Sequence, residues 1–174
     1  MERFGSRLFF TALFVLFLAG CGGEKAKPAQ DVPGGQFIKR FTAFESKDGK
    51  MKWSLVAEEA KVDEQSNRIE LSNFSVDFFK KDGKSVEAVL TAGSGEMDPA
   101  VNRFRTIGDS FVKTADGELL ETRDLYYDPE KKKIYGDSEV KLTRRDAIVT
   151  GKGIEATPDM ESVVIKKNRV EIKR

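Results

Sequence analysis

The feature that most constrains the fold is a turn signal that recurs at a fixed interval. Asp-Gly pairs occur at Asp48-Gly49, Asp82-Gly83 and Asp116-Gly117, 34 residues apart both times. An Asp-Gly pair between alternating segments is the strongest short-range signal for a β-hairpin, because both residues tolerate a positive φ. A second series is interleaved with the first, at Asp63, Asp98-Pro99, Asp128-Pro129 and Pro158-Asp159, and Arg144 to Asp146 forms a further candidate turn. The chain is therefore expected to be a meander of antiparallel strands.

The segments between these turns alternate between apolar and polar residues. Trp53, Leu55 and Ala57 share one face, and Ile69 and Leu71 share a face with Val76 and Phe78 across an expected bulge at residues 72–74. Period-two alternation indicates half-buried strands. A 34-residue interval also fits paired-helix repeats, but the chain has no sustained apolar stripe of helical period. The predicted fold is all-β, a folded meander of two facing sheets, or one bent sheet, around an apolar interior.

The first 20 residues have the pattern of a secretory signal. Arg3 and Arg7 precede an apolar run from Leu8 to Leu18, which is too short to span a bilayer comfortably. The run ends in Leu18-Ala19-Gly20-Cys21, which resembles the lipobox of bacterial lipoproteins. We expect residues 1–20 to be a lipoprotein signal peptide and Cys21 to carry lipid. A plain signal peptide with an incidental cysteine and a short membrane anchor are the alternatives.

Residues 21–36 are rich in lysine, proline, glutamine and glycine. Such a segment cannot bury enough apolar surface to offset the entropy of ordering, so it is expected to be a flexible, lipid-anchored tether. The folded domain is expected to cover residues 37–174.

The composition excludes most chemistry. The chain has no histidine and one cysteine, which removes the commonest general base and the usual zinc ligands. Loss of residues 1–20 leaves 28 basic and 28 acidic side chains, so bulk charge does not favour nucleic acid. Carboxylates such as Asp128 and Glu130 fall in predicted solvated turns. We expect no catalytic residue, no metal site, no cofactor and no enzyme activity.

Several motifs, taken in order, resemble the LptC family. They are Trp53-x-Leu-x-Ala-x-x-Ala60-x-x-Asp63, Ile69-x-Leu71, Val76-x-Phe78, Leu90-Thr-Ala92, Leu120-x-Thr-x-x-Leu125-x-Tyr-Asp128 and Val149-x-Gly151-x-Gly153. The resemblance covers roughly Phe37 to Arg174. It implies an open antiparallel β-jelly roll that holds lipopolysaccharide acyl chains and takes part in lipopolysaccharide export. The implied partners are the subunits of an inner-membrane ABC transporter and a soluble periplasmic bridge protein of the same fold.

The chain departs from this family in its anchor. Many members have a transmembrane helix, whereas this chain has the lipobox-like segment at Cys21. The implied location is the periplasmic face of the inner membrane, by a lipid anchor, with the outer membrane as the other possibility.

Strand parity selects the candidate site residues. The expected lipid-lined face consists of Leu71, Val76, Phe78, Leu90, Phe104, Leu125, Tyr127 and Leu142. The expected partner-binding edge is the C-terminal segment, with Val163, Ile165, Val170 and Ile172 directed toward the interior, and Phe41 and Phe44 mark the alternative N-terminal edge. Gly151 and Gly153 are expected to mark a bulge, with a close approach of another backbone as the alternative.

Two functions remain in competition. A lipid-transfer bridge should have an apolar interior that is open at an end. A structural or adhesive lipoprotein should have a closed core packed to normal density, without a ligand.

Overall fold

The computed structural model describes residues 35–63 and 65–173. Within these ranges the chain forms eleven β-strands, and no helix is long and apolar enough to cross a membrane. The strands are β1 (Gln36–Lys47), β2 (Lys50–Asp63), β3 (Arg68–Phe79), β4 (Val86–Asp98), β5 (Arg103–Thr114), β6 (Leu119–Arg123), β7 (Tyr126–Asp128), β8 (Lys133–Thr143), β9 (Ala147–Ala156), β10 (Val163–Ile165) and β11 (Arg169–Ile172).

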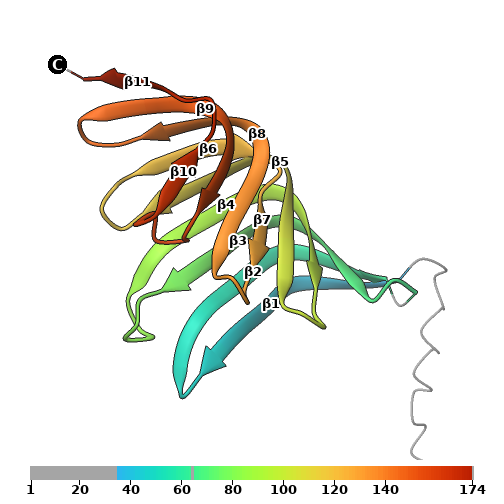
Figure 1. The fold of residues 1–174 in the computed structure, drawn as a ribbon. Helices are drawn as coiled ribbons and strands as arrows, with labels where there is room; N and C mark the ends of the chain where they lie inside the picture. Colours follow the sequence, from blue (N-terminus) through green and yellow to red (C-terminus); the bar gives the residue numbers. More distant parts are fainter. Residues whose placement is uncertain (1–34, 64, 174) are drawn as a thin grey trace, which may run out of the picture. The chain divides into compact units, whose positions relative to one another are not determined.

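The described strands form one antiparallel sheet in the order β1-β2-β3-β4-β5-β6-β8-β9-β10 (Figure 1). Strand β7 continues the line of β6 and pairs with β5 and β8, and β11 continues the line of β10 on β9. The predicted all-β meander is confirmed. Its two facing layers are halves of one hydrogen-bonded sheet, which was the bent-sheet form of the prediction.

Both predicted turn series connect successive strands. Asp48 and Gly49 join β1 to β2 with φ values of 53° and 70°, the conformation of a type I′ hairpin turn. In the next Asp-Gly turn, Asp82 Oδ1 accepts hydrogen bonds from the backbone N–H groups of Lys84 at 2.8 Å and Ser85 at 3.0 Å. Aspartate stabilises these turns because its side chain satisfies backbone donors that the turn leaves unpaired.

The strands share a line of irregular positions, which we call the crease. At each of these positions a residue is left out of the strand pairing or has a positive φ, and the positions lie next to one another in neighbouring strands. They are Arg40, Glu58, Asn73, Gly93, Gly108, Asp124, Asp137, Gly153 and Lys167. The residues Arg40, Asn73, Gly108, Asp124, Gly153 and Lys167 all have a positive φ. A bulge bends the strand that contains it. Because the bulges of β5 and β8 lie in line with the unpaired positions of β1 to β4, the whole sheet bends along one line.

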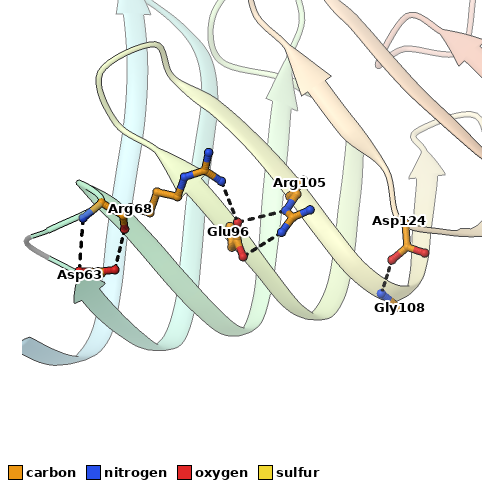
Figure 2. A network of polar contacts seen from close by, with 7 residues as sticks. Asp63, Arg68, Glu96, Arg105, Gly108 and Asp124 are labelled. Carbon is orange, nitrogen blue, oxygen red and sulfur yellow. Dashed lines mark hydrogen bonds and ion pairs between the residues drawn. The ribbon is translucent and has the colours of Figure 1, made fainter. Parts of the chain in front are cut away.

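Contacts along the crease hold it together. Asn73 Nδ2 donates to Glu58 Oε2 at 2.8 Å. Asp124 Oδ1 accepts from the Gly108 N–H at 2.8 Å, as Figure 2 shows, and the Asp124 N–H donates to the Gly108 carbonyl at 3.1 Å. The bulge predicted near Gly153 is confirmed, because the pairing of β8 with β9 shifts register between Gly136 and Glu139. At residues 72–74 the change of parity is present, but Asn73 lies opposite Glu58 and Gly93 without a shift of register, so the predicted bulge there is wrong.

The crease divides the sheet into two halves. We call one the Asp-Gly half, which ends at the turns 48–49, 80–85, 115–118 and 144–146. We call the other the Asp-Pro half, which ends at the turns 64–67, 99–102, 129–132 and 157–162. Buried positions change parity at the crease, from Ala57 to Ala60 in β2 and from Leu71 to Phe74 in β3. The change keeps the apolar face of both halves on the same side.

The two halves face each other across the apolar interior. Trp53 and Phe78 belong to the Asp-Gly half, and Phe104 and Tyr127 belong to the Asp-Pro half. The ring centroids of Trp53 and Phe104 are 5.9 Å apart, and those of Phe78 and Tyr127 are 5.2 Å apart. These contacts join residues that are distant along the sheet, so they establish that it folds back on itself at the crease.

Candidate functional site: the apolar interior and the sheet edges

The eight residues selected by strand parity lie together in one buried cluster. Val76, Phe78, Leu90 and Leu142 come from the Asp-Gly half. Leu71, Phe104, Leu125 and Tyr127 come from the Asp-Pro half. None is more than 8% exposed. They lie on one face because buried residues alternate with exposed ones within each strand, and because the alternation shifts by one residue at the crease.

Several equally buried residues were missing from the predicted face. Trp53, Leu55, Val112, Leu120 and Ile134 are all fully buried in the same cluster. All five pair across strands with one of the selected residues, so they lie on the same face of the sheet. Met160 is different, because it is buried from the turn at residues 157–162, where no alternation exists.

Cross-strand partners form an apolar ladder over the full width of the sheet. The members, each paired with the next, are Ala43, Leu55, Val76, Leu90, Val112, Leu120, Leu142, Val149 and Val170. The six from Leu55 to Leu142 are at most 2% exposed. At the two ends the ladder emerges, with Ala43 and Val149 half-buried and Val170 55% exposed.

Four aromatic side chains close the interior along the side opposite the crease. We call Trp53, Phe78, Phe104 and Tyr127 the ring cluster. Phe104 and Tyr127 stack with centroids 4.7 Å apart, and Trp53 meets Phe104 edge-on at 70°. The indole Nε1 of Trp53 donates to Glu45 Oε2 at 2.9 Å, which satisfies its buried polar group. Burial raises the pKa of the Tyr127 hydroxyl, so this ring stays neutral.

The two halves also approach each other beyond the ring cluster. Glu87, in β4, has a raised pKa because it is partly desolvated, and the charges of Asp159 and Glu161 raise that pKa further. Glu87 lies in the Asp-Gly half, whereas Asp159 and Glu161 lie in a turn of the Asp-Pro half. The apolar side chains in the middle of the sheet are buried, and those on the interior face become exposed toward β1 and β11.

A cavity of about 490 Å³ lies outside this interior. Its lining includes Arg40, Val56, Gly93 and Phe111, at the crease. Val56 and Phe111 alternate with buried neighbours and therefore lie on the outer face of the sheet. This cavity is not part of the predicted trough.

The C-terminal segment forms one edge of the sheet, through β10 and β11. Ile165 is buried and Val163 packs against the core, whereas Val170 and Ile172 are 55% and 78% exposed. All four residues were expected to point into the interior. Val163 and Ile165 pack there, but Val170 and Ile172 are exposed, so the expectation is wrong for these two. Val170 lies beside Val149, which packs against the core, but Val170 itself is not covered.

Hydrogen bonds show which backbone groups of β11 point outward. The Lys173 N–H donates to the Asp146 carbonyl at 2.9 Å, so residue 173 is in a hydrogen-bonded pair. Hydrogen-bonded and non-bonded pairs alternate in an antiparallel ladder. The N–H groups of Val170 and Ile172 therefore point away from β9, toward the free side of the edge.

The N-terminal edge is β1, which carries Phe41 and Phe44. Phe41 is half-buried and packs against the core, opposite Ala57. Phe44, opposite Ser54, is 63% exposed on the outer face. The two candidate edge residues therefore lie on opposite faces of the same strand.

A cluster of charged side chains lies on the outer face of the Asp-Pro half. Glu96 accepts from Arg68 Nη1 at 3.2 Å and from Arg105 Nη2 at 2.9 Å (Figure 2). The Arg105 guanidinium holds the pKa of Glu96 below its usual value. Exposed Tyr126 and Tyr135, which stack with ring centroids 5.5 Å apart, lie in the same half, so its outer face carries both charged and aromatic side chains.

The acidic turn residues have structural partners. Asp128 Oδ1 accepts from the N–H groups of Glu130 at 3.0 Å and Lys131 at 3.1 Å. Asp128 lies in the predicted turn, but it is buried, whereas a solvated side chain was expected. In residues 35–63 and 65–173, no three of His, Cys, Asp and Glu are grouped so as to hold a metal ion.

Two comparisons place this geometry among known proteins. A family model described as "Lipopolysaccharide-assembly, LptC-related" matches residues 8–171. The crystal structure of LptH, the LptA homologous periplasmic component of the conserved lipopolysaccharide transport device from Pseudomonas aeruginosa, is similar with a TM-score of 0.50. That match has 11% sequence identity and covers 70% of this chain and 94% of that chain, so it bears on the fold alone. It confirms the predicted β-jelly roll. No curated protein matches the chain.

Proposed function

Because the chain belongs to the lipopolysaccharide-assembly, LptC-related family, we propose that its interior binds the acyl chains of lipopolysaccharide and passes them to a neighbouring domain. The family gives the protein a role in lipopolysaccharide transport, and the protein is not an enzyme. The proposed ligand suits the interior, because an acyl chain needs a continuous apolar surface and no catalytic group.

The observation that carries this proposal is the apolar ladder. It runs from Ala43 in β1 to Val170 in β11 without a polar member, and it becomes exposed at both edges. A core that serves only to hold a sandwich together has no need to continue to exposed ends. An acyl chain gains about 0.8 kcal/mol for each methylene that it buries on such a surface.

We assign the free side of β10 and β11 to a soluble periplasmic bridge protein of the same fold. The outward N–H groups of Val170 and Ile172 offer hydrogen bonds to an added strand. Val170 would then continue the apolar ladder into the partner. The β1 edge, with Phe41 and Phe44, is the alternative docking site, and the subunits of an inner-membrane ABC transporter are the proposed source of the lipid.

The proposed location is the periplasmic face of the inner membrane. Cys21, the proposed lipid anchor, lies outside the described residues, as do the signal peptide proposed for residues 1–20 and most of the tether proposed for residues 21–36. A lipid anchor would hold the domain close to the transporter while the tether lets it move.

One observation favours the other candidate function, a structural lipoprotein without a ligand. The apolar side chains in the middle of the sheet are buried, as in a closed sandwich. Under that alternative the exposed ends of the ladder would serve no lipid.

Copurification distinguishes the two functions. The full chain is isolated from the membranes of cells that make lipopolysaccharide and is analysed by mass spectrometry for bound lipid A. We expect lipopolysaccharide at a substantial fraction of the protein, retained through washing. Absence of lipopolysaccharide, both as isolated and after incubation with lipopolysaccharide, would favour the structural alternative.

A further inference from the structure

We propose that the ring cluster is a gate: the two halves of the sheet part there, turning about the crease, to admit an acyl chain from the side. This inference rests on the proposed function and specifies the route by which the ligand enters. It concerns four residues, Trp53, Phe78, Phe104 and Tyr127.

The chemistry of the ligand selects the side on which it must enter. Lipopolysaccharide joins apolar chains to a large polar head, and burying that head without hydrogen-bond partners would be costly. The head must therefore stay in water while the chains lie inside. On the crease side the interior is closed by the backbone hydrogen bonds of a continuous sheet. The remaining long side is the line where the two halves meet, which the ring cluster occupies.

The contacts at this line are of a kind that an acyl chain can replace. Phe104 contacts Trp53, Phe78 and Tyr127, with ring centroids 5.9, 6.3 and 4.7 Å apart. Ring contacts are apolar and tolerate many orientations, so a chain inserted between the halves would exchange one apolar neighbour for another. The indole hydrogen bond of Trp53 would survive, because its acceptor Glu45 belongs to the same half.

The crease supplies the hinge that the gate needs. Residues with a positive φ interrupt β1, β3, β5 and β9 at this level, and the regular pairing is broken beside them. Gly93 and Gly108 have no atoms within 4 Å of where a side chain would begin. Small changes in backbone angles here would separate the two halves while each half keeps its own ladder of hydrogen bonds. Hinges of this kind absorb the motion at a few positions.

A reversible lock across the ring cluster tests the gate. Phe78→Cys and Tyr127→Cys are combined in the full chain, because the rings at these positions face each other at 5.2 Å from opposite halves. A short bis-thiosulfonate reagent joins the two thiols, and dithiothreitol releases them. Uptake of fluorescent lipopolysaccharide is measured with the same polypeptide, locked and released. We expect uptake to be at least tenfold slower when the protein is locked and to recover on reduction.

Uptake at the same rate in both states would overturn the gate. The unmodified protein is measured in parallel. If it takes up no lipopolysaccharide, the proposed function fails and not only the gate. A locked pair on the outer face of one half, Asp77→Cys with Val89→Cys in the adjacent strands β3 and β4, is the matched control and should not slow uptake.

A measurement on the unmodified protein covers the case in which the double variant does not fold. Trp53 is the only tryptophan of the chain, and it is fully buried at the gate. A lysophospholipid with a bromine-labelled acyl chain should quench its fluorescence strongly, because the chain would lie against the indole ring. Binding of that lipid without quenching would contradict entry at the ring cluster.

Discussion

Aspartates in the turns stabilise the fold by accepting several hydrogen bonds, which the ionised carboxylate accepts better than the protonated form. Asp82 accepts from the Ser85 hydroxyl at 2.6 Å in addition to two backbone N–H groups. The Ser85 hydroxyl, followed by these N–H groups, lowers the pKa of Asp82 from 3.8 to about 2. A carboxyl with a lowered pKa in the folded state stabilises the fold above its unfolded pKa. That contribution is lost as the pH falls from about 4 to about 2.

The Asp82→Asn variant tests this contribution. Asparagine keeps an acceptor for the backbone N–H groups but cannot gain a proton in this range. We expect the free energy of unfolding of the variant to depend less on pH between about 4 and 2 than that of the parent. Urea titrations at several pH values measure the difference. Parallel curves for the two proteins would show that Asp82 has no such role.

Gly151 has a steric role where β9 meets the C-terminal edge. A Cβ at this position would lie 2.5 Å from Ile165 Cγ2 and 2.6 Å from the Lys166 carbonyl oxygen. We expect Gly151→Ala to push β10 away from β9 and to lower the free energy of unfolding by about 1–3 kcal/mol. Gly93→Ala is the control, because a Cβ there meets no atom within 4 Å. Equal stability of the two variants in urea would contradict the assigned contact.

At the scale of strands, the turn series and the alternation predicted most of what the structure contains. Asp-Gly pairs and period-two alternation are local signals, and they located the turns and the buried faces of β2, β3 and β4. The crease was predicted only in part. Asn73 and Gly153 are residue types that accept a positive φ, but Arg40 and Lys167 also adopt one, and their residue types give no such signal. The alignment of the crease positions depends on register across all strands, which no single segment specifies.

The ring cluster and the exposed strand end could not be read from the sequence for the same reason. Trp53 and Phe104 meet only because the sheet folds back at the crease. Alternation placed Val170 and Ile172 on the interior face, but it cannot tell that these side chains are left exposed there. Burial at the edge of a sheet depends on which side chains of the other half lie opposite, which alternation does not specify.

Strand β11 offers a test of edge docking. Ile172→Pro removes an N–H that points away from β9, so pairing with β9 should remain while pairing with a partner strand fails. We expect affinity for the soluble bridge protein to fall at least tenfold, about 1.4 kcal/mol. Ile172→Ala keeps the N–H and serves as the control for the lost side chain.

The readout is binding of the purified bridge protein to immobilised variants whose circular dichroism is native-like. If the proline variant binds as tightly as the parent, the partner does not use this edge. The N-terminal edge at Phe41 and Phe44 would then be the docking site to examine.

At the scale of the whole molecule, anchorage and lipid binding have to work together. If Cys21 carries lipid, the domain stays within reach of the membrane from which its ligand comes. Cys21→Ala should abolish incorporation of labelled palmitate and leave the signal peptide unprocessed at this site. Palmitate incorporation that persists in this variant would place the modification elsewhere.

Photocrosslinking in cells that make lipopolysaccharide decides whether acyl chains enter the interior. A photoreactive phenylalanine analogue replaces Phe78, which is buried inside, and in separate variants replaces Glu70 and Asp77, which alternate to the outer face. After irradiation, adducts are detected by immunoblotting for lipopolysaccharide. We expect an adduct from position 78 and none from positions 70 and 77. Equal labelling at all three positions, or none at position 78, would contradict a lipid-binding interior.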